Sequence, residues 1–134
     1  MKNNLILICS FFLFLTVCHA QKVKMKNNVI FINGKETLRY AKKSHNNEYV
    51  IYELHTKNEI INVVSNINDG YKKILFVKSK KSLETTLGYW NKSFIKWLIE
   101  QDVMTIDGKL NNDQIDIFIE KYDEKITERK VYRN

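Results

Sequence analysis

The sequence predicts an α+β domain, in which an antiparallel β-meander of five to seven strands is followed by two C-terminal amphipathic helices packed on the sheet. Two observations predict the meander. Short β-rich runs separated by turn signals follow one another from residue 22 to about residue 87, and their connections are too short for the crossovers that parallel pairing needs. A third observation predicts the helices: beyond about residue 91, apolar residues recur at three- and four-residue steps.

The first 20 residues have the form of an export signal. A positive start precedes an apolar run over Leu5–Val17, and small residues follow at Cys18 and Ala20. The run is shorter than the roughly 20 residues that cross a bilayer, and no second run of that length follows. We therefore predict cleavage between Ala20 and Gln21, no transmembrane segment in the mature chain, and a periplasmic or secreted protein.

A lipoprotein anchored at Cys18 is the alternative. The leucine and the cysteine of a lipobox are present, but the residue before a lipidated cysteine is normally small, and Val17 is β-branched. The free mature chain is the favoured reading. It divides into a single domain over residues 21–127 and a loose tail over residues 128–134.

The first predicted hairpin joins residues 29–32 to a returning strand around Leu38 and Tyr40. Its turn is Asn33-Gly34, and Asn-Gly is the strongest short hairpin signal because both residues tolerate a positive φ. Residues 48–56 then alternate with period two. An apolar set comprises Val50, Tyr52 and Leu54, and a mixed opposite set comprises Tyr49, Ile51, Glu53 and His55.

Three further strands are expected over residues 59–65, 74–77 and 83–87, and a basic tip joins the last two. The helices come next. The first is expected from about Asn91 to Asp102, and the second begins at a capping box formed by Asn111 and Gln114. The apolar stripe of the second helix comprises Ile115, Phe118, Ile119, Tyr122 and Ile126.

Composition excludes several kinds of chemistry. Both cysteines, Cys9 and Cys18, lie in the leader, so the mature chain has no disulfide, thiol nucleophile or cysteine zinc site. It holds two histidines and no glycine-rich phosphate loop, so we expect neither a metal nor a cofactor. Asp107-Gly108 invites an EF-hand interpretation. That interpretation fails because Val103, Thr105 and Gln114 would stand at ligand positions.

Positive charge is concentrated in the first part of the domain. Residues 21–90 carry 13 Lys and Arg against 6 Asp and Glu, whereas residues 91–134 carry 8 against 9. Such asymmetry favours anionic partners, here an acidic protein or an anionic lipid or glycan of the cell envelope. Nucleic acid is not expected outside the cell. The candidate binding residues are Lys42, Lys43, Lys78, Lys80 and Lys81. The competing interpretation is that charged hairpin tips protect edge strands from aggregation.

Glu53 and His55 are the only catalytic candidates. They lie two residues apart on one strand, hence on one face, and could orient a water in a small hydrolase. A catalytic site needs a third oriented partner, and a solvated strand face explains the same pair. A carrier with an apolar cavity under the sheet is a further alternative to an enzyme.

Three segments carry a resemblance: QKVKMKNNVIFINGKETLRY, EYVIYELHT and FIKWLIEQDVMTIDGKLNNDQIDIFIEKYDE. Their order is similar to that in a group of small exported bacterial proteins of unknown function, with a signal peptide, a β-meander and two closing helices. The resemblance implies bacterial origin and export, and it brings no catalytic residue. We therefore expect an exported, non-enzymatic binding protein that contacts an anionic partner through its basic sheet half.

Overall fold

A computed structural model of the chain describes residues 20–131. The predicted signal peptide lies outside the described residues apart from Ala20, and so does the alternative anchor at Cys18. Cleavage, anchoring and export therefore stay predictions.

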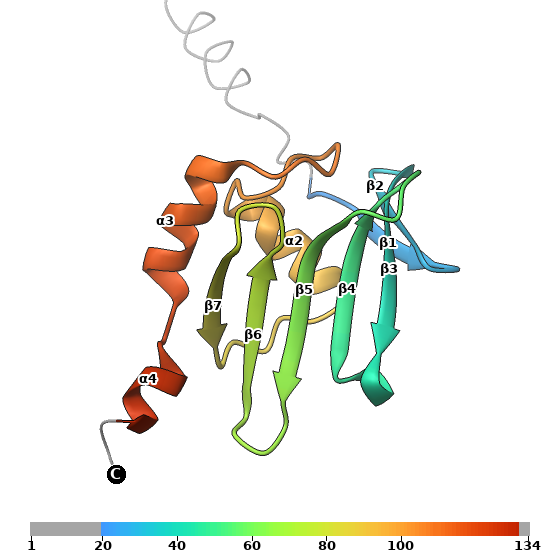
Figure 1. Ribbon diagram of the computed structural model, residues 1–134. Helices are drawn as coiled ribbons and strands as arrows, with labels where there is room; N and C mark the ends of the chain where they lie inside the picture. The colour runs from blue at the N-terminus through green and yellow to red at the C-terminus, as the bar shows by residue number, and fades with distance from the viewer. Residues whose placement is uncertain (1–19, 132–134) are drawn as a thin grey trace, which may run out of the picture.

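The fold is α+β, as predicted, and its sheet is a seven-stranded antiparallel meander in chain order β1 to β7 (Figure 1). The strands are β1 (Val23–Lys26), β2 (Val29–Ile32), β3 (Lys35–Lys43), β4 (Glu48–Glu53), β5 (Glu59–Asn66), β6 (Tyr71–Phe76) and β7 (Lys81–Thr85). Every strand pairs with its neighbour in sequence, because every connection is short.

Asparagine-rich turns set the first two hairpins. The predicted Asn33-Gly34 turn is present, with φ values of 52° and 84°. The β1–β2 hairpin was not predicted, and its turn is Asn27-Asn28, with φ values of 51° and 63°. Asn is one of the few residues other than Gly that adopt the left-handed conformation readily. The same chemistry therefore explains both turns.

The helices follow the sheet. A single 3₁₀ turn, η1 (Ser44–Asn46), joins β3 to β4, and the helices are α2 (Lys92–Glu100), α3 (Asn112–Tyr122) and α4 (Ile126–Val131). In Figure 1, α2 lies across one face of the sheet, while α3 and α4 run along the β7 edge. Within residues 20–131, no helix is both long and apolar enough to cross a membrane.

The core lies between the sheet and α2. Tyr49 and Ile51 of β4 are fully buried in it, beside Ile61 of β5 and the helical residues Ile95 and Leu98. Tyr49 and Ile51 belong to the set that the sequence pattern described as mixed, so the mixed face of β4 is the one that contacts the core. Val50 and Tyr52, the residues marked as apolar, lie on the opposite face. Glu53 and His55 are exposed because β4 ends at Glu53, so neither polar side chain is buried in the core.

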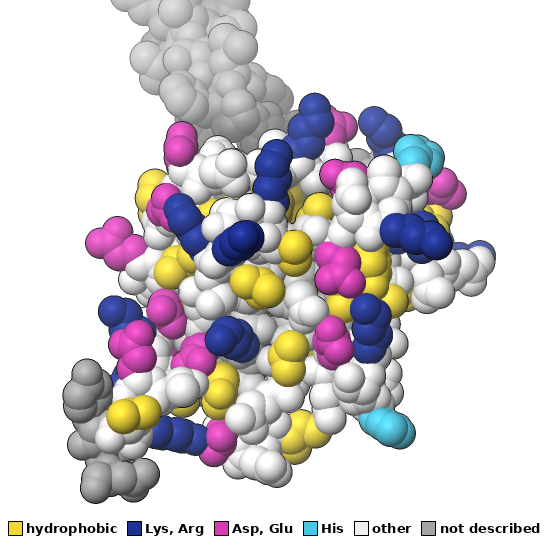
Figure 2. All heavy atoms as spheres, in the orientation of Figure 1, with side chains coloured by type: hydrophobic (Ala, Val, Ile, Leu, Met, Phe, Trp, Pro, Cys, Tyr) yellow, Lys and Arg dark blue, Asp and Glu magenta, His cyan; other side chains and the backbone are white. Residues whose placement is uncertain are grey.

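Charged side chains of both signs are scattered among apolar and other side chains on the other face of the sheet (Figure 2). There the Lys43 ammonium lies 3.4 Å from the Glu59 carboxylate and 5.8 Å from the centre of the Tyr52 ring. The Tyr52 hydroxyl also donates to Glu59 at 3.5 Å. In this network the positive charge of Lys43 is therefore offset by Glu59.

Helix α3 ends earlier than predicted. The expected stripe ran on to Ile126, whereas α3 ends at Tyr122, and Asp123 adopts an extended conformation with ψ of 112°. The Asp123 carboxylate accepts hydrogen bonds from the backbone N–H groups of Glu84 at 2.9 Å and Lys125 at 3.1 Å. These bonds to β7 and to the next turn replace the continuation of the helix.

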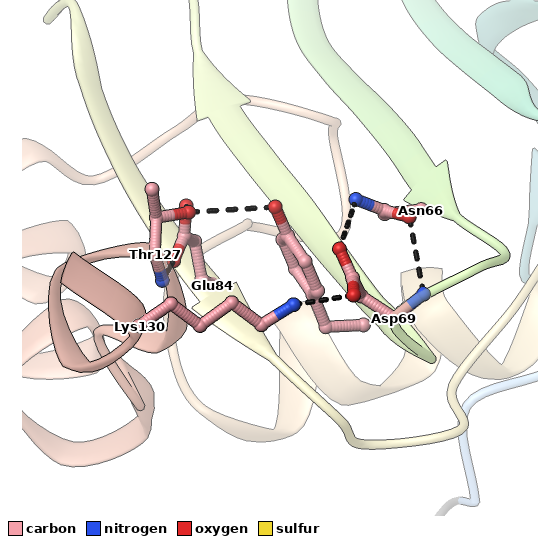
Figure 3. A network of polar contacts seen from close by, with 6 residues as sticks. Asn66, Asp69, Glu84, Thr127 and Lys130 are labelled. Carbon is pink, nitrogen blue, oxygen red and sulfur yellow. Dashed lines mark hydrogen bonds and ion pairs between the residues drawn. The ribbon is translucent and has the colours of Figure 1, made fainter. Parts of the chain in front are cut away.

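Segment 123–131 packs along the β7 edge and is hydrogen-bonded to it. Its last four residues, 128–131, belong to the part that was predicted to be a loose tail. The Glu124 N–H donates to the Glu84 carbonyl at 2.8 Å, as a neighbouring strand would. Thr127 donates to the Glu84 carboxylate through its N–H at 2.7 Å and its hydroxyl at 2.6 Å. The Thr127 hydroxyl also lies 3.4 Å from the Tyr71 hydroxyl. Figure 3 shows Lys130 paired with Asp69 in the β5–β6 turn. The start of the predicted tail is therefore helical and attached.

Candidate functional site

The five predicted binding lysines lie at opposite ends of the sheet. Lys42 and Lys43 end β3 next to η1, whereas Lys78 and Lys80 lie in the β6–β7 turn and Lys81 begins β7. The β3 end is level with the start of β6, since the intervening strands are antiparallel. The structure therefore separates the two groups.

Two of the five lysines are paired with carboxylates. Lys43 contacts Glu59 on the uncovered face, and Lys81 contacts Asp116 of α3. Exposed pairs of this kind contribute about 0–1 kcal/mol to stability, and they offset charge locally. Among residues 20–131, no carboxylate lies within 4.0 Å of the Lys42, Lys78 or Lys80 ammonium groups.

Lys42 lines a hollow of about 330 Å³ beside the first strand, which we name the basic hollow. Its lining residues are Val23, Lys24, Met25, Tyr40, Lys42, Asn91 and Lys92. Three consecutive residues come from β1, which pairs only with β2 in the described chain, so the hollow follows an edge strand. The lining includes three lysines and no carboxylate, so the hollow is strongly basic.

Strand alternation separates Lys42 from Lys43. Lys42 lies on the same face of β3 as Tyr40, which packs against the core, and Lys43 lies on the uncovered face. Sequence reasoning grouped these two lysines and missed Lys24 and Lys92. The residues that line the hollow are distant in sequence, and only the packing of α2 against β1 brings them together. No local pattern could have identified them.

An aromatic cluster lies behind the basic hollow. The Tyr40 and Tyr49 rings are 5.8 Å apart, and the Tyr49 and Trp90 rings are 5.5 Å apart. The Lys72 ammonium lies 4.9 Å from the Trp90 ring and donates to the Tyr89 carbonyl at 2.9 Å. Burial lowers the pKa of Lys72. Aromatic faces beside ammonium groups can hold a ligand that has both an anionic group and an apolar face.

Asn91 closes one side of the hollow in a strained conformation. Its φ is 51°, and its side chain makes no capping hydrogen bond to α2. The Asn91 Oδ1 atom is buried and accepts no hydrogen bond from the described residues. An acceptor left unpaired costs about 1–3 kcal/mol, so a hydroxyl or amide donor at this position would relieve that cost.

Glu53 and His55 are not hydrogen-bonded to each other. Glu53 Oε2 accepts from the Thr56 hydroxyl at 2.7 Å and from the Asn58 amide at 3.0 Å, which stabilises the β4–β5 turn. These two bonds lower the pKa of Glu53. His55 is exposed in the turn, and no hydrogen bond joins it to a described carboxylate. The pair therefore lacks the oriented base that a hydrolase of this type needs.

The Asp107-Gly108 segment is a turn. The Thr105 N–H donates to the Lys109 carbonyl at 2.8 Å, and the Gly108 N–H donates to the Thr105 carbonyl at 2.9 Å. Asp107 instead pairs with Lys35 at 3.5 Å. The Asn111 side chain caps α3, as the capping-box pattern predicted. No three His, Cys, Asp or Glu side chains in the described part of the chain gather as a metal site.

The fold and the hollow thus define a small α+β protein with a concave basic surface. Comparison with known families, curated proteins and solved structures finds no match to the chain. Function must therefore be argued from the site.

Proposed function

We propose that this chain is an exported, non-catalytic binding protein that contacts an anionic partner of the cell envelope or its surroundings. The single observation that carries the proposal is the basic hollow, whose lining includes Lys24, Lys42 and Lys92 and no carboxylate. The leader pattern of residues 1–20 supports export.

Electrostatics favours this surface over Lys43 and Lys81. The ammonium groups of Lys43 and Lys81 already have carboxylate partners, so an incoming anion must compete with those partners. In a concavity without a carboxylate, positive potential is not offset locally, and low-dielectric walls focus the field. Of the five predicted binding lysines, Lys42 is the one that lines the basic hollow.

The proposal is tested by two variants with the same change in net charge. The hollow variant carries Lys42→Gln and Lys92→Gln, and the control carries Lys43→Gln and Lys80→Gln, which lie outside the hollow. Each is expressed from the full chain and applied to an immobilised sulfated polysaccharide as an anionic probe. We expect the hollow variant to elute at clearly lower salt than the control, because screening weakens the contacts that remain.

A cross-linked pull-down from native envelope extract then identifies the partner. A species captured by the wild-type protein and the control, but lost with the hollow variant, would support the proposal. Equal elution of the two variants would contradict it, since binding would then follow net charge without regard to position.

A further inference from the structure

A second and larger hollow lies at the other end of the sheet, and we name it the end hollow. It has a volume of about 450 Å³, within the range of about 300–1,000 Å³ that small-molecule sites occupy. It is formed where β3 and β5 begin, where β4 and β6 end, and where loop 105–111 leads into α3. Its lining shares no residue with the basic hollow.

The floor of the end hollow is apolar. Leu38, Phe76 and Ile115 are each no more than 3% exposed, and three half-buried side chains extend this floor toward the opening. These are Leu54, Ile60 and Leu110. An apolar ligand group that entered here would replace water against these three half-buried side chains, which is favourable in proportion to the apolar area covered.

The rim carries charges of both signs. Glu53, Asp107, Lys78 and Lys109 all line the opening, and, in addition to the two hydrogen bonds that Glu53 accepts, the positive charge of Lys78 helps to lower the pKa of Glu53. Asp107 already pairs with Lys35, so Glu53 is the carboxylate available to a cation. A ligand with one sign of charge would meet repulsion from part of this rim, whereas a ligand with separated opposite charges would complement it.

Glu53 is held in place before any ligand arrives. Both of its hydrogen bonds, from Thr56 and Asn58, use the Oε2 atom, and Oε1 accepts none from the described residues. Because those bonds lower the pKa of Glu53, the carboxylate is ionised at neutral pH. The arrangement presents one oriented oxygen at the rim of an apolar hollow.

Loop 105–111 is packed closely against β3. Gly108 is buried with φ of 79°, and a Cβ atom there would lie 2.8 Å from the Thr37 methyl group and 2.9 Å from two Leu38 carbons. Only glycine permits this approach. The antiparallel bridge between Met104 and Leu110 also fixes the loop. The hollow is therefore formed by rigid elements.

We propose that the end hollow binds a short peptide through its free amino terminus and an apolar side chain. The terminal ammonium donates to Glu53 Oε1, and the side chain covers the half-buried Ile60 and Leu110. The peptide carboxylate lies toward Lys78 and Lys109. A peptide combines the groups that this rim and floor complement: separated opposite charges, amide donors and acceptors, and an apolar side chain.

The test is a titration of the full chain with the dipeptide Leu-Leu, followed by amide NMR shifts and calorimetry. N-acetyl-Leu-Leu lacks the ammonium, and Gly-Gly lacks the apolar side chains. We expect Leu-Leu to saturate amides that line the end hollow at concentrations up to about 10 mM, and the other two probes to bind at least about tenfold more weakly.

A matched pair of variants locates the contact. Glu53→Gln keeps an acceptor for Thr56 and Asn58 but removes the charge, and Glu36→Gln changes an exposed glutamate outside the lining. We expect Glu53→Gln to weaken Leu-Leu binding about tenfold, because hydrogen bonds to charged groups are stronger, and Glu36→Gln to bind as wild type.

Three outcomes would overturn the proposal. These are equal affinity of the wild-type protein for Leu-Leu and its N-acetyl form, wild-type affinity of Glu53→Gln, and absence of saturation at the hollow. The probe series needs no variant, so it decides the question even if Glu53→Gln alters the turn. A negative result would not count against the proposed function of the basic hollow, since the two sites share no residue.

Discussion

The two edge strands of the sheet, β1 and β7, differ in how they are protected. Along β7, segment 123–131 supplies backbone and side-chain hydrogen bonds to Glu84 and Thr86, and α3 packs alongside. Along β1, the edge strand pairs only with β2 in the described chain and carries Lys24 and Lys26. Proteins protect sheet edges either by covering them or by placing charge on them. Among residues 20–131, this chain covers the β7 edge and places charge on the β1 edge.

Aromatic side chains are also more deeply buried near the β7 edge than near the β1 edge. At the covered edge, Trp97 is 4% exposed and its ring lies within 4.6–6.3 Å of four other aromatic rings. Beside the basic hollow, Trp90 is half-buried and contacts Tyr49 and Lys72. We infer that the covered side contributes most to stability and that the open side is free to serve binding.

Replacing the two tryptophans measures this difference directly. We expect Trp97→Ala to lower the free energy of unfolding by about 3–5 kcal/mol, the usual cost of removing a buried aromatic side chain. Trp90→Ala is expected to cost clearly less, because its side chain is partly solvated. Urea denaturation of both variants measures the free energy of unfolding. Similar losses in the two variants would contradict the inference that the covered side contributes more to stability.

A smaller effect is expected at the covered edge itself. Asp123→Ala leaves the half-buried Glu84 N–H without its acceptor, so we expect a loss of about 1–3 kcal/mol. Glu120→Ala, an exposed site on the same helix, is the control and should change stability by less than about 0.5 kcal/mol. If the two variants unfold at the same denaturant concentration, the edge contact contributes nothing.

The smallest effect at neutral pH concerns Tyr49, which backs the basic hollow. Burial raises the pKa of Tyr49 above its ordinary value of 10.0, so the folded protein keeps the hydroxyl proton after the unfolded chain would lose it. The stabilisation is complete below pH 10 and is lost as the pH rises above 10 toward the folded pKa. The wild-type protein should therefore lose stability above pH 10.

Tyr49→Phe removes this dependence. Between pH 10 and 11 we expect the variant to lose about 1 kcal/mol less than the wild-type protein, measured by denaturation at a series of pH values. Tyr52→Phe, on the uncovered face, is the control. Parallel pH profiles for Tyr49→Phe and the wild-type protein would show that the buried hydroxyl does not couple folding to pH.

Local patterns predicted the elements well, and specific residues explain where they did not. The Asn33-Gly34 turn and the cap at Asn111 depend on backbone conformation over a few residues, and both are confirmed. The end of α3 was wrong because Asp123 bonds to Glu84, which lies 39 residues away. No periodicity in the helix itself carries that information.

The candidate site was predicted only in part. Lys42 lines the basic hollow, but Lys24 and Lys92 were missed because they come from different elements. Glu53 lines the end hollow with Lys78, although the sequence suggested separate roles for these two residues and paired Glu53 with His55. A run of charges shows which residues are basic, and it does not show which of them share a surface.

By itself, the sequence determined the meander, the helical C-terminal part and the uneven charge, because turn chemistry, residue period and composition act over short distances. Tertiary structure decided which face of β4 is buried, which lysines are neutralised and where the two hollows form. These depend on strand register and on contacts between segments distant in sequence, and a shift of one residue in register would exchange Lys42 with Lys43 across the sheet.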